Sequence, residues 1–189
     1  MVARAAARSG PADRHDDRRS HVTSNISRWS FRSQCLLGFA LCAGLVGFAI
    51  LSQFQWGLQP CPLCIFQRIA FAALGAVLLV AGLHAPSGAT GRRAYGVLAL
   101  LPALAGIGIA TRHVWLTHLP ADQVPSCGPP LSFMMESSPL TDVIRKVLTG
   151  SGECATVDWT FLGLSMPAWS LLWFVLLALL VLAAAFRRR

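Results

Sequence analysis

The sequence predicts an all-α membrane protein, a four-helix transmembrane bundle with a short amphipathic helix in its second outward loop. Hydrophobic residues make up 54% of the chain and charged residues only 13%, a composition unlike that of soluble domains. The apolar residues fall in four blocks, each close to the roughly 20 residues that cross the hydrocarbon core of a bilayer. These blocks cover residues 35–52, 65–83, 95–116 and 167–186, and 189 residues suit one such domain.

Basic residues gather on one side of the four blocks, which predicts the orientation of the chain. Seven arginines precede the first block, Arg92 and Arg93 lie between the second and third blocks, and three arginines end the chain. The positive-inside rule therefore places both termini in the cytoplasm and the loops after the first and third blocks on the outward side. This topology accounts for the net charge of +8, so no nucleic-acid partner is expected.

The chain is expected to have three parts. Residues 1–32 are rich in Arg, Ala, Asp and Ser and are predicted to form a basic, disordered cytoplasmic tail. Residues 33–186 hold the four spans, and residues 187–189 form a basic cytoplasmic C-terminus. No small-x-small cleavage pattern follows the first block, so this block is expected to remain as an anchor. A basic arm that binds anionic lipid or nucleic acid is the alternative interpretation of residues 1–32.

Four of the six cysteines lie in the outward loops, where disulfides persist. Cys61 and Cys64 belong to the first loop, and Cys127 and Cys154 belong to the second. Three interpretations are open: a zinc site, a pair of inert structural disulfides, and a redox relay in which one pair exchanges electrons with the other. The zinc site is disfavoured because Cys127 and Cys154 each lack a second Cys or His close by. The exchange between the two pairs requires only that a thiolate of one pair can reach the disulfide of the other.

The motif Cys-Pro-Leu-Cys at residues 61–64 favours the relay. Pro62 suits the first turn of a helix, which puts Cys61 at the lip of the second span and Cys64 inside its first turn. The positive end of the helix dipole favours a thiolate at Cys64. Arg68 follows one turn later on the same face, where a charge is costly unless it is used or paired. Snorkelling of Arg68 to the headgroups is the alternative.

The second outward loop combines an accessible cysteine with a short helix. Five prolines surround Cys127 and are expected to leave it on a mobile, accessible stretch. Apolar positions in residues 140–148 follow helical spacing, which predicts an amphipathic helix that either lies flat on the bilayer or packs against the bundle end. Glycines at 150 and 152 are expected to end this helix and to leave Cys154 free to move.

Other residues in and near the spans are interpreted as packing or interface features. Cys35 and Cys42 lie seven residues apart in the first block and are expected to pack as small apolar residues. Small residues at four-residue spacing are expected to let helices approach closely, and these pairs are Ala40 and Gly44, Ala99 and Ala103, and Gly106 and Ala110. Interfacial aromatic residues are expected at Trp159, Phe161 and Trp169. Taken alone, His113 at the end of the third block fits an interfacial polar residue.

With these residues, the chain resembles the disulfide bond formation protein B (DsbB) family of bacterial inner-membrane quinone reductases. The resemblance covers residues 33–186 and is carried by Cys-x-Leu-Cys-x-x-x-Arg at 61–68 and by the run into the last helix at 159–169. A single cysteine on each side of the amphipathic helix fits as well. Gln67 stands where some members of the family carry a Glu.

The resemblance implies a route for electrons. A reduced DsbA-like protein of the periplasm would be oxidised by a Cys127–Cys154 disulfide, and Cys154 would then exchange with Cys61 of a Cys61–Cys64 disulfide. Cys64 would face a membrane quinone, either ubiquinone or menaquinone, and these four cysteines would be the catalytic residues. The expected partners are the DsbA-like thiol oxidant and membrane lipid, with no metal.

The resemblance also implies where the quinone binds and where the protein resides. Arg68, His113 and Met166 match positions that line the quinone site of the family. The location would be the inner membrane, with both cysteine loops and the amphipathic helix in the periplasm. Two other functions stay open: a membrane assembly or structural protein with inert loop disulfides, and an exporter of reducing equivalents that uses Cys35 and Cys42.

Overall fold

The computed structural model describes residues 30–57, 60–120, 122–126, 131–157 and 159–187. Cys127 and nearly all of the expected N-terminal tail lie outside these residues, so the predictions made for them are not addressed by the structure. The chain from Phe31 onward forms a compact unit of its own. Its four long helices are α2 (Phe31–Trp56), α3 (Pro62–His84), α4 (Ala89–Leu116) and α7 (Met166–Phe186).

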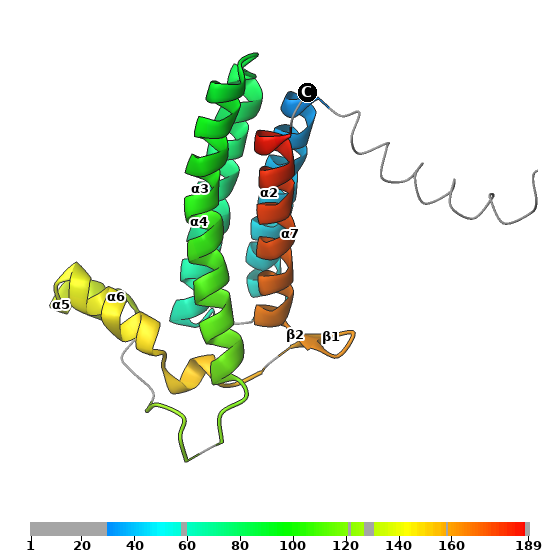
Figure 1. Cartoon of the computed structure of the whole chain (residues 1–189). Coiled ribbons are helices and arrows are strands. Elements are labelled where there is room, and N and C mark those ends of the chain that lie inside the picture. Colours follow the sequence, from blue (N-terminus) through cyan, green and yellow to red (C-terminus); the bar gives the residue numbers. More distant parts are fainter. Residues whose placement is uncertain (1–29, 58–59, 121, 127–130, 158, 188–189) are drawn as a thin grey trace, which may run out of the picture. The chain divides into compact units, whose positions relative to one another are not determined.

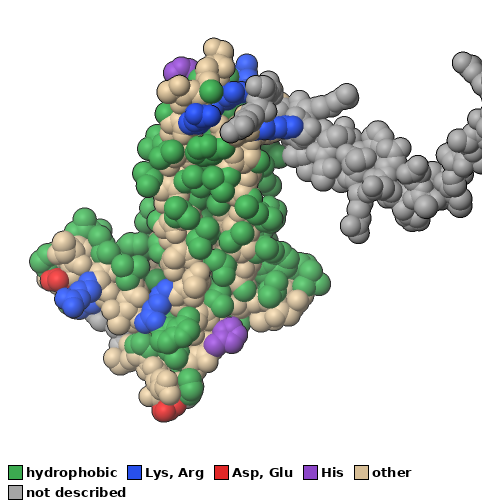
Figure 2. All heavy atoms as spheres, in the orientation of Figure 1, with side chains coloured by type: hydrophobic (Ala, Val, Ile, Leu, Met, Phe, Trp, Pro, Cys, Tyr) green, Lys and Arg blue, Asp and Glu red, His purple; other side chains and the backbone are tan. Residues whose placement is uncertain are grey.

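All four long helices are long and apolar enough to cross a membrane. Only 22% to 39% of the most apolar window of each helix is buried inside the protein, so most of this apolar surface faces outward. Figure 2 shows hydrophobic side chains along the length of the bundle, with Lys and Arg side chains near its ends. Such a surface requires lipid around it. The predicted all-α, four-helix membrane fold is therefore confirmed, and the protein is a multi-pass membrane protein.

The helices are longer than the apolar blocks that predicted them. Helix α2 includes residues on both sides of the predicted block 35–52, and α4 begins at Ala89 rather than near Tyr95. Arg92 and Arg93 consequently lie in the first turns of α4 instead of in a loop. Apolar runs mark only the hydrocarbon depth, whereas the helix continues into the interface, where long basic side chains reach the polar headgroups.

The long helices pack in sequence around a core that is rich in small residues. Helix α2 packs along α3, α3 along α4, and α4 along α7, and a smaller contact joins α2 to α7. On α4 the predicted small residues are buried, and Gly106 lies against the ring of Phe174 on α7. The Phe174 ring in turn stacks on Phe71 of α3 at a centroid distance of 3.7 Å. One small residue thus allows an aromatic pair to fill the centre of the bundle.

The prediction that Ala40 and Gly44 form a packing face is wrong, because both residues are exposed. The buried face of α2 instead carries Cys35 and Cys42, which confirms their interpretation as packing residues. A Cβ added at Gly75 of α3 would lie 3.1 Å from the Cβ of Cys42. Four-residue spacing of small residues identified a possible contact face, but it could not tell which side of α2 meets α3.

The shorter elements lie at the end of the bundle where α3 and α7 begin (Figure 1). They are α5 (Leu131–Ser137), α6 (Leu140–Thr149), the 3-10 turn η2 (Gly152–Cys154), and the antiparallel strands β1 (Thr160–Phe161) and β2 (Leu164–Ser165). Helix α6 confirms the predicted amphipathic helix. Val143 and Val147 on its inner face are buried against Leu63 of α3 and Leu116 of α4, so α6 packs against the bundle end.

Replacing Gly106 with Ala is expected to destabilise the protein by about 1–3 kcal/mol, because the added methyl group would overlap the buried Phe174 ring. Gly108, one half-turn away, has no atom within 4 Å of an added Cβ, so Gly108→Ala should not destabilise the protein and should gain up to about 1 kcal/mol from helix propensity. Unfolding of both variants in detergent micelles measures the difference. Equal stability of the two variants would contradict the packing described here.

Candidate functional site

The Cys-Pro-Leu-Cys motif begins α3 as predicted. Cys61 is the N-cap residue, with extended backbone angles of φ −66° and ψ 163°, and Pro62 follows in the first turn. The Cys61 sulfur accepts a hydrogen bond from the backbone N–H of Cys64 at 3.4 Å, which satisfies one of the free amide groups of the helix start. The first cysteine therefore caps the helix and the second lies inside its first turn.

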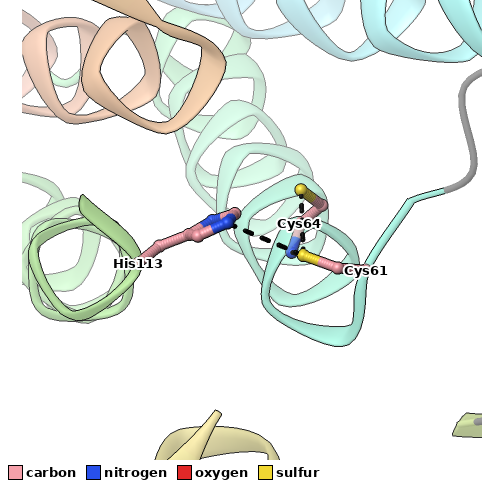
Figure 3. Close-up of side chains that lie close together, drawn as sticks. All are labelled: Cys61, Cys64 and His113. Atoms are coloured by element: carbon pink, nitrogen blue, oxygen red, sulfur yellow. Dashed lines mark hydrogen bonds between the residues drawn. The ribbon is translucent and has the colours of Figure 1, made fainter. Parts of the chain in front are cut away.

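The two sulfurs of the motif lie beside each other (Figure 3). Their Sγ atoms are 3.3 Å apart. Cys61 is only 8% exposed, whereas Cys64 is half-buried and lies closer to the membrane interior. A small rotation of the side chains would bring the sulfurs to the bonding distance of a disulfide. The two sulfurs are thus close enough for a disulfide between them to be considered.

His113 of α4 approaches the same pair from the neighbouring helix (Figure 3). Its Nε2 atom lies 3.7 Å from the Cys61 sulfur, and its Nδ1 atom lies 3.1 Å from the side-chain nitrogen of Gln67. His113 and Gln67 are 3% and 4% exposed. When the Gln67 amide donates to Nδ1, the ring proton resides on Nε2 and faces the Cys61 sulfur. His113 is therefore a partner of Cys61, and not the interfacial residue that its position in the sequence indicated.

Cys154 reaches the site from η2 and is fully buried, at 0% exposure. It packs in the same buried cluster as Cys61, and its sulfur lies 3.7 Å from the hydroxyl oxygen of Ser151. The prediction that Cys154 lies on a freely moving segment is wrong. Glycines at 150 and 152 suggested mobility, but Gly150 forms a fixed turn with φ +87° that packs against Leu116.

Arg112 fixes this turn from α4. Its guanidinium Nη2 donates to the carbonyl of Thr149 at 2.8 Å, and its Nε donates to the carbonyl of Leu148 at 3.3 Å. These carbonyls end α6 and have no partner within the helix. The same guanidinium lies 4.2 Å from the ring centroid of Trp115. Arg112 therefore holds the C-terminal end of α6, which leads directly into the turn with Cys154.

Two of the thiols, Cys61 and Cys154, lie outside the long helices, and their surroundings shift the pKa of each. The hydrogen bond with Cys61, together with burial, raises the pKa of Cys154 well above its usual range. For Cys61, the hydrogen bond with Cys154 lowers the pKa, but the neighbouring Cys64 thiol and burial outweigh it and raise the pKa to about 12. Both thiols consequently keep their protons at neutral pH when the site is reduced.

On the other side of Cys64 is an apolar cavity of about 310 Å³. It lies between α2, α3, α7 and the β1–β2 hairpin, and its few polar groups come from Cys64, Gln67, Arg68 and Ser170. Trp159, Phe161 and Trp169 line this cavity. The rings of Trp159 and Phe161 are stacked, the Trp169 ring is tilted against Phe161, and the Trp169 indole N–H donates to the Phe161 carbonyl at 3.0 Å. Their interpretation as interfacial aromatics was incomplete, because all three also form part of the cavity wall.

Arg68 lies at this cavity and is paired with α2. Its Nη1 donates to Gln53 Oε1 at 2.9 Å, and its Nη2 donates to the Ala49 carbonyl at 3.0 Å. The guanidinium is held by two hydrogen bonds between neighbouring helices, so the alternative of free snorkelling does not apply. Two donors of a fixed fork are used in these bonds, and the other N–H groups stay available for a ligand.

A second cavity, of about 70 Å³, adjoins the first. Cys64, Arg68 and Met166 line both cavities, whereas Cys61 and His113 line only the small one. The structure thus brings Arg68 and Met166 together with Cys64 at the large cavity. At the small cavity it brings all three residues predicted for the quinone site, Arg68, His113 and Met166, together with Cys61 and Cys64.

A close cysteine pair at the start of a long apolar helix, with a third cysteine from a distant loop in the same buried cluster, is an arrangement typical of a membrane-bound thiol–disulfide oxidoreductase. The sequence profile of the family Disulfide bond formation protein DsbB matches residues 31–184. The chain belongs to this DsbB family of disulfide bond formation proteins.

Individual relatives agree with this assignment. Disulfide bond formation protein B of Xanthomonas campestris pv. campestris (strain 8004) is 58% identical over 165 residues, which cover 87% of this chain and 96% of that protein. The protein of the same name from Xylella fastidiosa (strain Temecula1 / ATCC 700964) is 55% identical over 163 residues, which cover 86% of this chain and 94% of that protein.

Three residues with structural roles at the site were not identified from the sequence. Gln53 holds Arg68, Gln67 holds His113, and Arg112 holds the turn before Cys154. Polar residues at the ends of apolar blocks are a general signal for such roles, because a buried amide or charge needs a partner. The sequence does not tell which partner each one meets.

The raised pKa of Cys61 predicts the pH dependence of its alkylation in the reduced protein. Because only the thiolate reacts, the rate at Cys61 should rise about tenfold per pH unit from pH 7 to pH 10 without levelling. Mass spectrometry of the labelled peptide measures this rate, and the urea-unfolded protein, in which the rate should level near pH 9, is the control. Levelling near pH 9 in the folded protein would contradict the burial of this thiol.

The same shift has a consequence for stability. The folded, reduced protein keeps a proton on Cys61 that the unfolded chain releases above about pH 9. Stability that is present below this pH is therefore lost as the pH rises toward 12.

Proposed function

We propose that this protein is a thiol oxidase that reoxidises a periplasmic DsbA-like dithiol and passes the electrons to membrane quinone through two cysteine pairs. The observation that carries the proposal is the position of the sulfurs. The Cys61 sulfur lies 3.3 Å from the Cys64 sulfur, Cys154 packs in the same buried cluster as Cys61, and Cys64 in turn lines an apolar cavity between the long helices. Electrons can thus enter from a loop on one side and leave toward the bilayer on the other.

The first half of the reaction consists of two thiol–disulfide exchanges. A partner thiolate attacks Cys127 of a Cys127–Cys154 disulfide, and the second partner thiol then displaces Cys127, which leaves the partner oxidised and both cysteines reduced. Cys154 attacks Cys61 of the Cys61–Cys64 disulfide and releases Cys64 as a thiolate. Cys127 finally displaces Cys61 from Cys154. The second pair is an intact disulfide again, and the first pair now carries the two electrons.

The packing of Cys61 and Cys154 in one buried cluster supports the transfer step. In-line attack requires the incoming sulfur beside the disulfide that it opens. The His113 ring, with its Nε2 atom 3.7 Å from the Cys61 sulfur, is positioned to hold a proton next to this sulfur when it is displaced.

The second half of the reaction requires an acceptor of two electrons and two protons, which a quinone supplies when it becomes a quinol. The residues at the large cavity fit such a group. The cavity of about 310 Å³ has the size of a small-ligand site and is apolar apart from a few convergent donors. Unused N–H groups of Arg68 would bind a carbonyl oxygen of the ring and stabilise the negative charge that develops there. Met166 would contact the ring face.

Charge placement supports an inner-membrane location with the cysteine loops in the periplasm. Arg92 and Arg93 in the first turns of α4 and Arg187 after α7 lie at the end of the bundle opposite α6. By the positive-inside rule, that end faces the cytoplasm. The sulfur site and the short elements then face the oxidising side.

Anaerobic mixing of the purified protein with a reduced DsbA-like partner and a water-soluble quinone tests the proposal. Quinone loss, followed by absorbance, should occur with the unaltered protein and should be absent in Cys64→Ser. Cys42→Ala is the matched control and should keep full turnover, because Cys42 only packs against α3. Unchanged turnover in Cys64→Ser would rule out the scheme. Loss of turnover in Cys42→Ala would favour a route through α2.

Arg68 is tested in the same assay. Arg68→Met should raise KM for the quinone about tenfold or more, because a charged hydrogen-bond donor is lost, while KM for the partner protein should be unchanged. Arg145→Met, an exposed substitution on α6, is the control. If quinone is never consumed and all outward cysteines resist reduction, the protein is a structural one with inert disulfides.

A further inference from the structure

The reduced sulfur site also contains the ligands of a metal site. One ligand atom from each of Cys61, Cys64 and His113 lies within 4.8 Å of the others. The sequence argued against zinc because it offered only the widely spaced outward cysteines. The structure adds a histidine to the possible zinc ligands. Helix α4 brings His113 beside the Cys61–Cys64 motif, although the two are far apart in the sequence.

The distances between these atoms match a tetrahedral zinc site. Zinc bound to two cysteine sulfurs and one histidine nitrogen requires about 3.8 Å between the sulfurs and about 3.6 Å between sulfur and nitrogen. The sulfurs of Cys61 and Cys64 are 3.3 Å apart, and the Cys61 sulfur is 3.7 Å from His113 Nε2. The third separation, between the Cys64 sulfur and a His113 ring nitrogen, is below 4.8 Å, so side-chain rotations that move these atoms by up to about 1 Å would complete the site.

A supporting residue for the histidine is already present. Histidines that bind zinc through one nitrogen usually donate the other N–H to a fixed acceptor, which holds the ring in place. Gln67 lies 3.1 Å from His113 Nδ1, on the side away from the sulfurs, and is buried. A half-turn of its amide group presents the oxygen instead of the nitrogen, so Gln67 can accept this proton when a metal occupies Nε2.

The small cavity provides space for the ion and its remaining ligand. It has a volume of about 70 Å³ and is lined by Cys61, Cys64 and His113. This volume holds an ion together with a water molecule in the fourth position. Glu153 lines the same cavity, is exposed, and adds negative charge on the path of an incoming cation.

We infer that the reduced protein binds one zinc-type divalent ion through Cys61, Cys64 and His113, with Gln67 as the residue that orients the histidine. Binding replaces the two thiol protons with two metal–sulfur bonds and releases both protons, and no electrons are transferred. The disulfide has no thiolates to offer, so metal binding and disulfide formation exclude each other. The ion is an inhibitor that traps the reduced enzyme, and its binding does not depend on quinone as the acceptor.

Metal titration of the anaerobically reduced protein in detergent tests the inference. Cd²⁺ is followed by the absorbance of its sulfur bonds, and Zn²⁺ by competition with a coloured chelator. One ion per chain is expected, with no tight binding after oxidation. His113→Ala should weaken binding about 100-fold or more, and Gln67→Leu about tenfold. His118→Ala, an exposed histidine one turn beyond, should bind as the unaltered protein does. Unchanged affinity in His113→Ala would overturn the inference.

A measurement on the unaltered protein tests the inference without relying on variants that could misfold. X-ray absorption at the zinc edge should give a mixed shell with sulfur at about 2.3 Å and nitrogen at about 2.0–2.1 Å. A shell without a histidine nitrogen, or one of oxygen alone, would overturn the inference. Turnover of the metal-free protein is measured separately, so failure of the metal site is distinguishable from failure of the proposed oxidase activity.

Discussion

Three thiols and one imidazole meet where α3 begins, and the rest of the structure maintains this contact. Cys61 is the shared member, because its sulfur lies beside Cys64, Cys154 and His113. Two thiolates side by side would repel each other, whereas a protonated thiol can donate a hydrogen bond to a neighbouring thiolate, so a negative charge is carried by one of these sulfurs at a time. Thiols arranged in this way are placed to exchange disulfide partners with one another, which three thiols far apart could not do.

Two different environments flank the sulfur pair, and each is built by different elements. On the loop side, α6 packs its valines against the bundle end, and Arg112 fixes the carbonyls before the turn that carries Cys154. On the membrane side, Cys64 lines an apolar cavity that is closed by the β1–β2 hairpin and bordered by the Arg68 guanidinium. Gln53 holds that guanidinium in place. Cys61 thus packs with the residues of the loop, whereas Cys64 lines the cavity between the long helices.

Apolar runs and local chemistry predicted the four spans, the helix start at Pro62 and the amphipathic helix, since each depends on residues that are neighbours in the chain. The contacts of the site could not be predicted in this way. His113 and Cys154 reach Cys61 from other elements, and the burial of Cys154 depends on how Gly150 packs against Leu116. Glycines signal a turn, but only the fold determines whether that turn is held. The resemblance to a family indicated that His113 is functional, but only the structure shows that it lies beside Cys61.

Disulfide trapping between Cys61 and Cys154 tests the central contact most directly. In a variant with Cys64→Ser and Cys127→Ser, these are the two remaining cysteines outside the long helices, while Cys35 and Cys42 stay buried in α2. Mild oxidation followed by peptide mapping should give a Cys61–Cys154 disulfide in most molecules, with α2 cysteines unmodified. Persistence of both as free thiols, in a variant that keeps its helical content, would contradict the account.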